Sequence, residues 1–241
     1  MNLTVVKGLQ SEIFVPVTPP PVWAPVTKPL NEMVIALATA AGVHRKEDKR
    51  FNLAGDFTWR EIYDSTPSSD LMVSHGGYDN SDVNKDINCM FPIDRLHELA
   101  KEGFIKGVAP VHIGFMGGGG NIEKFTHETG PAIAKRLKDE GVDAVLMTAG
   151  CGTCHRSAVL VQRAIESVGI PTIIIAALPP VVKQTGTPRA VAPLVPMGAN
   201  AGAPHNVEQQ TAIVKATLEQ LEEITTPGTV VPLPFEYQAK V

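Results

Sequence analysis

The chain has 241 residues, 44% hydrophobic and 19% charged, as expected for one globular domain with a sizeable core. Its net charge of −4 argues against nucleic acid or an anionic membrane as a partner, because both attract proteins with a basic excess. Residues 1–7 do not have the pattern of a signal peptide, and the apolar segment 170–182 is too short to span a bilayer. The three cysteines make no disulfide framework, which is typical of a reducing compartment. We therefore expect a cytoplasmic protein without membrane insertion.

Proline is concentrated at both ends of the chain. Prolines between residues 16 and 25 exclude a helix or an inner strand, so residues 1–30 are predicted to form an extended arm. Residues 225–241 repeat this composition and are predicted to form a second extended arm. Between them, residues 31–224 form the predicted catalytic body, as one unit or as two lobes that share a cleft. Two such arms suggest contacts between subunits.

Strand and helix patterns alternate along the body. Predicted strands cover residues 33–40, 71–74, 111–115, 144–148 and 172–176. Predicted helices cover residues 92–102, 128–140, 157–168 and 207–224. The continuous apolar strands predict a mostly parallel sheet with helices on both faces, which is a Rossmann-like α/β fold. Functional residues of such sheets lie in loops after the strands. The loops predicted here are 74–86, 115–124, 150–156 and 177–204.

The loop after the second predicted strand contains three candidate site residues. His75 is a candidate acid or base, and Tyr78 and Asp79 are candidate ligands for an amine. A lone histidine is more often a hydrogen-bonded structural residue, so a structural role for His75 stays open.

Four consecutive glycines follow the strand at 111–115. Successive N–H groups in such a run can bind an anion, such as a substrate carboxylate, and Gly118 and Gly119 are the candidate ligands. A loop that requires positive φ angles or close packing explains the same glycines equally well. The run matches neither a P-loop nor a dinucleotide-binding motif, because no lysine and serine or threonine follow and residue 122 is Ile.

A Cys-Gly-Thr-Cys sequence at 151–154 lies between a buried strand and a helix, and this position predicts a redox pair. The helix dipole and unpaired N–H groups at a helix N-terminus stabilise a thiolate. We expect a solvent-facing Cys151 as the nucleophile and Cys154 as the resolving thiol, because this spacing allows a disulfide. His155 is a candidate for tuning the acidity of the pair. Zinc is disfavoured because no second close pair of ligands exists, so no metal is predicted.

Segments 148–156, 74–79 and 91–96 and the helix from Ser157 resemble the selenoprotein subunits of D-proline reductase and the B components of the glycine, sarcosine and betaine reductases. The resemblance covers nearly the whole chain. In this family the first position of the redox motif is selenocysteine, so the resemblance implies selenocysteine natively at position 151, where this chain has Cys151. A thiolate is a poorer nucleophile and leaving group than a selenolate, and a sulfur version should therefore be the slower catalyst.

The resemblance also implies an oxidoreductase mechanism. A pyruvoyl group on a partner subunit captures the amine of D-proline, and the nucleophile at position 151 attacks the α-carbon. The ring opens to 5-aminovalerate, and Cys154 resolves the adduct. An electron-donating redox protein then reduces the resulting bridge. The chain itself would bind no cofactor and would act within a hetero-oligomer.

Three alternatives remain compatible with the sequence. The first is a B-type subunit of glycine, sarcosine or betaine reductase, although Ser157 stands where the resemblance implies a further cysteine in those longer chains. The second is a general CxxC thiol–disulfide electron carrier. The third is a non-catalytic assembly subunit whose arms hold a complex together.

Overall fold

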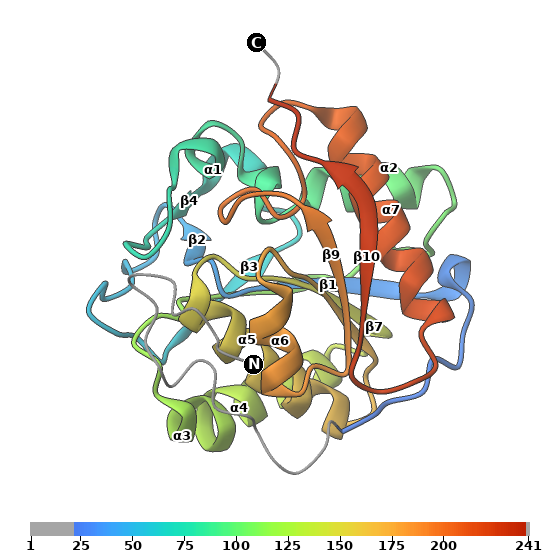
Figure 1. The fold of residues 1–241 in the computed structure, drawn as a ribbon, viewed down its shortest axis with the longest axis horizontal. Coiled ribbons are helices and arrows are strands. Elements are labelled where there is room, and N and C mark those ends of the chain that lie inside the picture. The colour runs from blue at the N-terminus through green and yellow to red at the C-terminus, as the bar shows by residue number, and fades with distance from the viewer. Residues whose placement is uncertain (1–21, 240–241) are drawn as a thin grey trace.

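An eight-stranded sheet runs through the centre of the molecule in the computed structural model, which describes residues 22–239 (Figure 1). Most of the predicted N-terminal arm therefore lies outside the described residues. In spatial order the strands are β10 (Thr229–Glu236), β9 (Arg189–Leu194), β8 (Thr172–Ile175), β7 (Ala144–Thr148), β1 (Val34–Thr39), β6 (Val111–Phe115) and β3 (Trp59–Tyr63), and β5 (Gly107–Val108) also pairs with β1. Every pair is parallel except β3 with β6.

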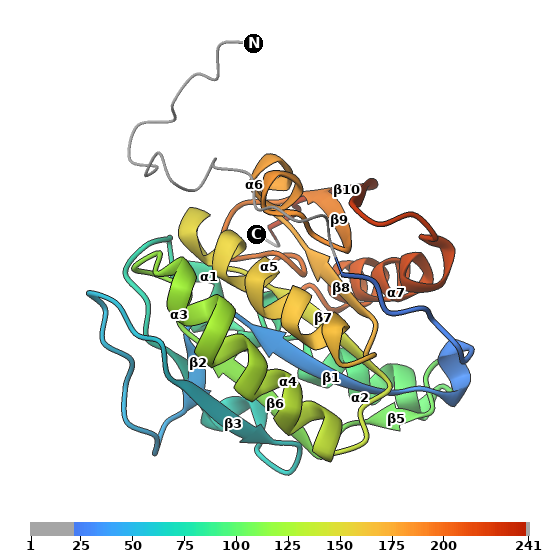
Figure 2. The same cartoon turned by 90° about the horizontal axis from the view of Figure 1, so that it is seen from below.

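Helices cover both faces of this sheet (Figure 2). Alternate side chains of β7 enter two separate cores, since Leu146 packs in one and Val145 and Met147 pack in the other. The first core contains α2 (Ile93–Lys101) and α7 (Val207–Glu223), and the second contains α4 (Gly130–Asp139) and α5 (Gly152–Ser167). α6 (Pro179–Thr185) packs beside α5, and the shorter helices are α1 (Ser81–Lys85) and α3 (Ile122–Lys124). The prediction of an α/β fold with a mostly parallel sheet is confirmed.

The strand order locates the place where a site is expected. Counted in chain order, the parallel strands β1, β6, β7, β8, β9 and β10 lie side by side as 2-1-3-4-5-6, which extends the flavodoxin-like order and differs from the Rossmann order. The order reverses between β1 and β7. Ligands of such sheets bind at the carboxyl ends of the strands beside this reversal.

The last crossover differs from the two before it. Strands β7 to β10 follow one another in a single direction across the sheet, but α7 lies on the face opposite to α5 and α6. The β9–α7–β10 connection therefore has the opposite hand to β7–α5–β8 and β8–α6–β9. Parallel crossovers are nearly always right-handed, so this connection is unusual.

Several predicted segments differ in the structure. The predicted strand 71–74 forms β4 (Leu71–Val73), but it pairs antiparallel with β2 (Val43–Arg45) in a separate two-stranded sheet. The prediction of one loop over residues 177–204 was wrong in part, because this segment contains α6 and β9. Within the predicted C-terminal arm, β10 forms an edge strand, the position in a sheet that tolerates its two prolines.

A buried ion pair binds the segment that precedes β1. Glu166 and Arg189 are both fully buried, and Arg189 Nη1 lies 2.8 Å from Glu166 Oε1. The Ala24 N–H donates to Glu166 over 2.5 Å, and Arg189 donates to the Ala24 carbonyl over 2.7 Å. The Trp23 ring covers the Arg189 guanidinium, with 3.4 Å between the guanidinium carbon and the ring centroid. This arrangement, called the strap below, connects residues 23–24 to α5 and β9.

Candidate active site

The Cys-Gly-Thr-Cys motif forms the first turn of α5. Cys151 is the N-cap residue, and its sulfur accepts the N–H of Cys154 at 3.3 Å. The Thr153 hydroxyl lies 3.1 Å from the same sulfur. The helix begins at Gly152, earlier than the predicted start at residue 157, so Cys154 faces the interior. The sulfur of Cys151 therefore accepts one backbone N–H at the positive end of the dipole of a sixteen-residue helix.

His75 completes a cluster with the two cysteines. Its Nε2 lies 2.8 Å from the Cys154 sulfur, and the three potential ligand atoms of His75, Cys151 and Cys154 all lie within 4.8 Å of one another. His75 follows β4, so the cluster unites the predicted loops 74–86 and 150–156 near the carboxyl end of β7. This is the place where the strand order reverses.

The two thiols differ strongly in acidity. A hydrogen bond from the Cys154 side chain lowers the pKa of Cys151 to about 4, and hydrogen bonds from His75 and Thr153 add to this effect against the opposing effect of burial. Burial, and the neighbouring Cys151, raise the pKa of Cys154 well above its ordinary value. Near neutral pH the pair therefore consists of a thiolate at position 151 and a thiol at position 154, which is the state of a nucleophile with its resolving thiol.

The reactive sulfur is less accessible than predicted. Cys151 was expected to face solvent, but it is 6% exposed, and Cys154 is 0% exposed. The backbone at Gly77 lies next to the Cys151 side chain, because a Cβ atom added to this glycine would lie 3.4 Å from the Cys151 sulfur. Both Gly76 and Gly77 are themselves exposed. An exposed glycine backbone therefore lies next to the thiolate.

Tyr78 holds the loop that contains His75 and Gly77 against the body. Its ring packs against the backbone of Gly150 and Gly198, and its centroid lies 4.8 Å from that of His75. The phenol donates a hydrogen bond to the Ala41 carbonyl over 2.8 Å, and burial raises the Tyr78 pKa well above 10. These contacts position the His75 loop on the body.

Asp79 lies outside the cluster. Its side chain is exposed and accepts the N–H of Ser81 at 2.9 Å, so in this structure it contributes to the start of α1.

Close packing and unusual φ angles account for most of the glycine run after β6. A Cβ atom on Gly117 would lie 2.7 Å from the Cys154 Cα, and Gly119 and Gly120 have φ angles of 91° and 63°. The Gly118 N–H donates to the Met116 sulfur over 3.1 Å. A Cβ atom on Gly118 would lie 3.7 Å from His75 Nε2, so the run borders the cluster.

His155 lies beside the motif but contributes no positive charge. Burial lowers its pKa, and its Nε2 accepts the N–H groups of Ala177 and Leu178 at 3.1 and 3.2 Å. Its Nδ1 therefore carries the proton and donates to the Cys151 carbonyl over 2.7 Å. The ring is neutral, and it joins the N-cap residue to the loop after β8.

The cluster has the ligand types of a soft-metal site, but its hydrogen bonds do not suit one. The Gly77 N–H donates to His75 Nδ1 over 2.8 Å, so the proton of the neutral ring is on Nε2. A metal needs the lone pair of that nitrogen. In this conformation the histidine can donate a hydrogen bond to sulfur but cannot bind a metal through Nε2.

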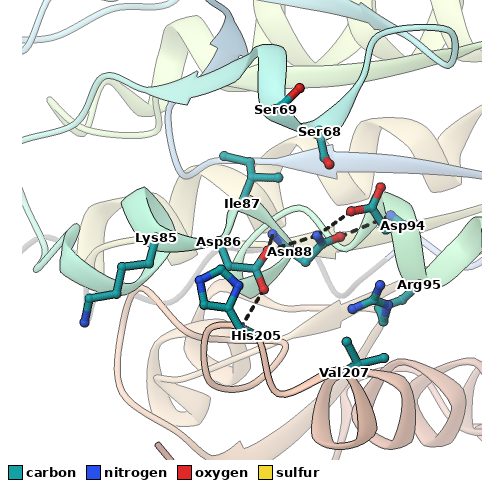
Figure 3. A pocket seen from close by; sticks show the side chains of 10 residues that line it. All are labelled: Ser68, Ser69, Lys85, Asp86, Ile87, Asn88, Asp94, Arg95, His205 and Val207. Atoms are coloured by element: carbon teal, nitrogen blue, oxygen red, sulfur yellow. Dashed lines mark hydrogen bonds between the residues drawn. The ribbon is translucent and has the colours of Figure 1, made fainter. Parts of the chain in front are cut away.

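A cavity of about 370 Å³ lies apart from the cluster, and His75, Cys151 and Cys154 do not line it (Figure 3). Inside it, the Asn88 amide donates to the carboxylates of Asp86 and Asp94 over 2.9 and 2.7 Å. The backbone N–H of His205 donates to the Asp86 carboxylate over 2.9 Å. These contacts hold the loop before α7 against the start of α2.

Sequence reasoning missed two groups of the site, one beside a sulfur and one beside the His75 ring. Thr153 lies inside the motif, and its hydroxyl beside an N-cap thiol was a usable signal. The Gly77 N–H that fixes the His75 ring is a backbone group. No side-chain pattern could have indicated it.

Comparisons with known proteins identify the family of this chain. Residues 6–150 match the family described as glycine/sarcosine/betaine reductase selenoprotein B. The whole chain is 72% identical to the D-proline reductase subunit gamma of Acetoanaerobium sticklandii and covers 99% of that protein. No solved structure matches the chain. Among residues 22–239, no helix is long and apolar enough to cross a membrane.

More distant relatives are longer proteins. The chain is 34% identical, over 69% of its length, to the glycine reductase complex component B subunit gamma of Carboxydothermus hydrogenoformans, and it covers 39% of that protein. It is 28% identical, over 92% of its length, to the sarcosine reductase complex component B subunit beta of Peptoclostridium acidaminophilum, and it covers 52% of that protein. The family match over residues 6–150 and the full-length relative together show that the chain belongs to the glycine/sarcosine/betaine reductase selenoprotein B family.

Proposed function

We propose that this chain is the catalytic subunit of a D-proline reductase, with Cys151 and Cys154 as its redox pair. The observation that carries the proposal is the pairing of a thiolate and a thiol on the first turn of α5. The 72% identity to a D-proline reductase subunit over the whole chain supports this substrate over glycine, sarcosine or betaine. The relatives named for glycine and sarcosine are only 34% and 28% identical.

In the proposed reaction the chain supplies the nucleophile and two electrons. A pyruvoyl group on the partner subunit would withdraw electrons from the substrate. The Cys151 thiolate attacks the α-carbon of D-proline, the bond from that carbon to the ring nitrogen breaks, and the nitrogen keeps the electron pair and takes a proton. Cys154 then attacks the Cys151 sulfur, the carbon–sulfur bond breaks, and the carbon takes the electron pair and a proton. The product is 5-aminovalerate, and the two thiols become a disulfide.

The disulfide must be reduced before the next turnover. We propose a dithiol redox protein as the electron donor, within a hetero-oligomer that also contains the pyruvoyl subunit. We further propose that the native residue at position 151 is selenocysteine. The N-cap position suits a selenolate for the same reasons that it suits a thiolate. The selenium isotope pattern of peptide 139–156 from the native host tests this assignment.

Reconstitution tests the proposal directly. The chain is mixed with a pyruvoyl-bearing partner, D-proline and a dithiol, and 5-aminovalerate is measured. We expect Cys151→Ala to abolish product formation. We expect Cys154→Ala to give at most one turnover and to retain a substrate adduct on Cys151, visible by mass spectrometry.

Cys89 provides the matched control. It is fully buried and lies outside the cluster, so Cys89→Ala should retain turnover. Normal multiple turnover by Cys154→Ala would contradict the resolving role. If the wild-type chain forms the disulfide but cleaves no D-proline, a general disulfide carrier becomes the better assignment.

A further inference from the structure

The two sulfurs differ in the groups that lie closest to them. Cys151 receives the N–H of Cys154 and faces the Thr153 hydroxyl. Cys154 is completely buried, and the side chain within hydrogen-bond distance of its sulfur is His75, at 2.8 Å from Nε2. The backbone N–H of the helix therefore serves the nucleophile, whereas His75 contributes to both sulfurs and lies directly against the resolving one.

The His75 ring is held in one tautomer. The Gly77 N–H donates to Nδ1 over 2.8 Å, which requires a lone pair on that nitrogen. The proton of the neutral ring is then on Nε2, which points at Cys154. Protonation of Nδ1 would place two donors against each other. Neutral histidines held in this way act in enzymes as hydrogen-bond donors to developing negative charge.

Reduction of the disulfide creates negative charge on Cys154. Cys151 is the more accessible sulfur, so an incoming thiolate attacks it first. The disulfide bond breaks, and its electron pair passes to Cys154, which leaves as a thiolate and later takes a proton. The second thiol of the reductant then displaces Cys151 and completes the reduction. Burial makes Cys154 a poor leaving group, because it raises the pKa of this thiol.

We propose that His75 is a fixed hydrogen-bond donor that stabilises the Cys154 thiolate during disulfide exchange, and that it does not transfer protons as an acid or base. The Gly77 amide is a positioning group, because it fixes the tautomer. This role rests on the dithiol function proposed above. It gives His75 a second role beside its hydrogen bond to the nucleophile.

The test measures reduction of the oxidised chain at pH 7.5. Diamide forms the Cys151–Cys154 disulfide in the full chain, excess dithiothreitol reduces it, and acid-quenched samples are alkylated and counted by mass spectrometry. We expect His75→Ala to slow reduction roughly 10- to 100-fold, the size of a hydrogen bond to a charged group. We expect His75→Gln to reduce at a rate within about threefold of wild type, because a glutamine amide can replace the Nε2 donor.

His97→Ala is the control for loss of a histidine, because His97 lies on α2 and pairs with Asp64. Its reduction rate should equal that of the wild type. A wild-type rate for His75→Ala, or an equally slow His75→Gln, would overturn the proposed donor role. If diamide forms no Cys151–Cys154 disulfide in the wild-type chain, it is the dithiol function itself that fails.

Discussion

Cys151 and Cys154 differ in acidity because they occupy different positions on one helical turn. The sulfur of the N-cap residue accepts a backbone N–H, whereas the sulfur three residues later is enclosed by the core. Hydrogen bonds favour the charged form of the first, and burial penalises the charged form of the second. The same local sequence thus produces both partners of a disulfide exchange.

The acidity of Cys151 should appear in its alkylation. With a pKa of about 4, Cys151 is already ionised at pH 6, so the rate with iodoacetamide should be constant from about pH 6 to 8 and fall by half near pH 4. An ordinary cysteine would instead gain about tenfold per pH unit up to about pH 8.5. Mass spectrometry of the alkylated peptide measures the rate at each pH.

Thr153→Val should move the midpoint of this profile upward, and Thr153→Ser should leave it in place, because serine keeps the hydroxyl. Cys151→Ser supplies the background. A rate that still rises between pH 6 and 8 in the wild type would contradict a stabilised thiolate. The lowered pKa of Cys151 also makes the stability of the fold depend on pH. The folded pKa is depressed, so the ionised thiol stabilises the fold fully above its unfolded pKa, and this stabilisation is lost as the pH falls towards 4.

At the scale of elements, the start of α5 depends on close packing by the glycine loop after β6. Gly117 lies against the backbone of Cys154, and the Ser157 hydroxyl donates to the Gly117 carbonyl over 2.8 Å. The loop and the helix are therefore joined at the position where the redox pair must be held.

Gly117→Ala should disturb this contact. The added Cβ atom would lie 2.7 Å from the Cys154 Cα and 3.1 Å from the Ala40 Cβ, neither of which can move freely. We expect the free energy of unfolding to fall by about 1–3 kcal/mol, the usual effect of overpacking, as measured by urea denaturation. Gly76→Ala is the matched control, because no atom lies within 4 Å of its added Cβ. Equal stability of the two variants would show that the contact is unimportant.

The elements that sequence reasoning located are those whose burial produces a clear pattern. Helices α2, α4 and α7 and strands β1, β6, β7 and β8 lie within about two residues of their predicted bounds. α6 begins with two prolines, and β9 and β10 contain prolines, so their sequences resemble loops. The position of α7 could not be predicted, because the usual crossover hand would place it on the other face.

For the site, sequence reasoning located the two cysteines and the histidines but not the partners of each ring nitrogen. In both His75 and His155, backbone N–H groups donate to one ring nitrogen, and this determines which nitrogen of the neutral ring carries the proton. Such donors depend on how distant loops approach, and the identity of the donating residue carries no signal.

At the scale of the whole molecule, the strap connects sequence positions that are far apart. Glu166 is near the end of α5, Arg189 begins β9, and Ala24 precedes β1. Both charges are fully buried, so each depends on the other and on backbone groups for its solvation.

Removing one of these charges should be costly. We expect Arg189→Met to lower the free energy of unfolding by about 3–5 kcal/mol, because it leaves Glu166 buried without its ion partner. Arg136→Met is the matched control, since Arg136 pairs with Glu61 but is 26% exposed, and it should cost about 0–1 kcal/mol. Urea denaturation of both variants decides the matter. Similar losses for the two arginines would contradict a structural role for the strap.

The strap and the C-terminal strand meet at the same residue. Arg189 holds Ala24 through its side chain, and in the sheet it is the register partner of Thr229 at the start of β10. Terminal segments are usually the first parts of a domain to fray. Here Ala24 and β10 both contact Arg189 of β9, so we expect the two segments to open together. Opening of either end should therefore expose β9 amides to hydrogen exchange, and the two ends of the body should behave as one cooperative unit.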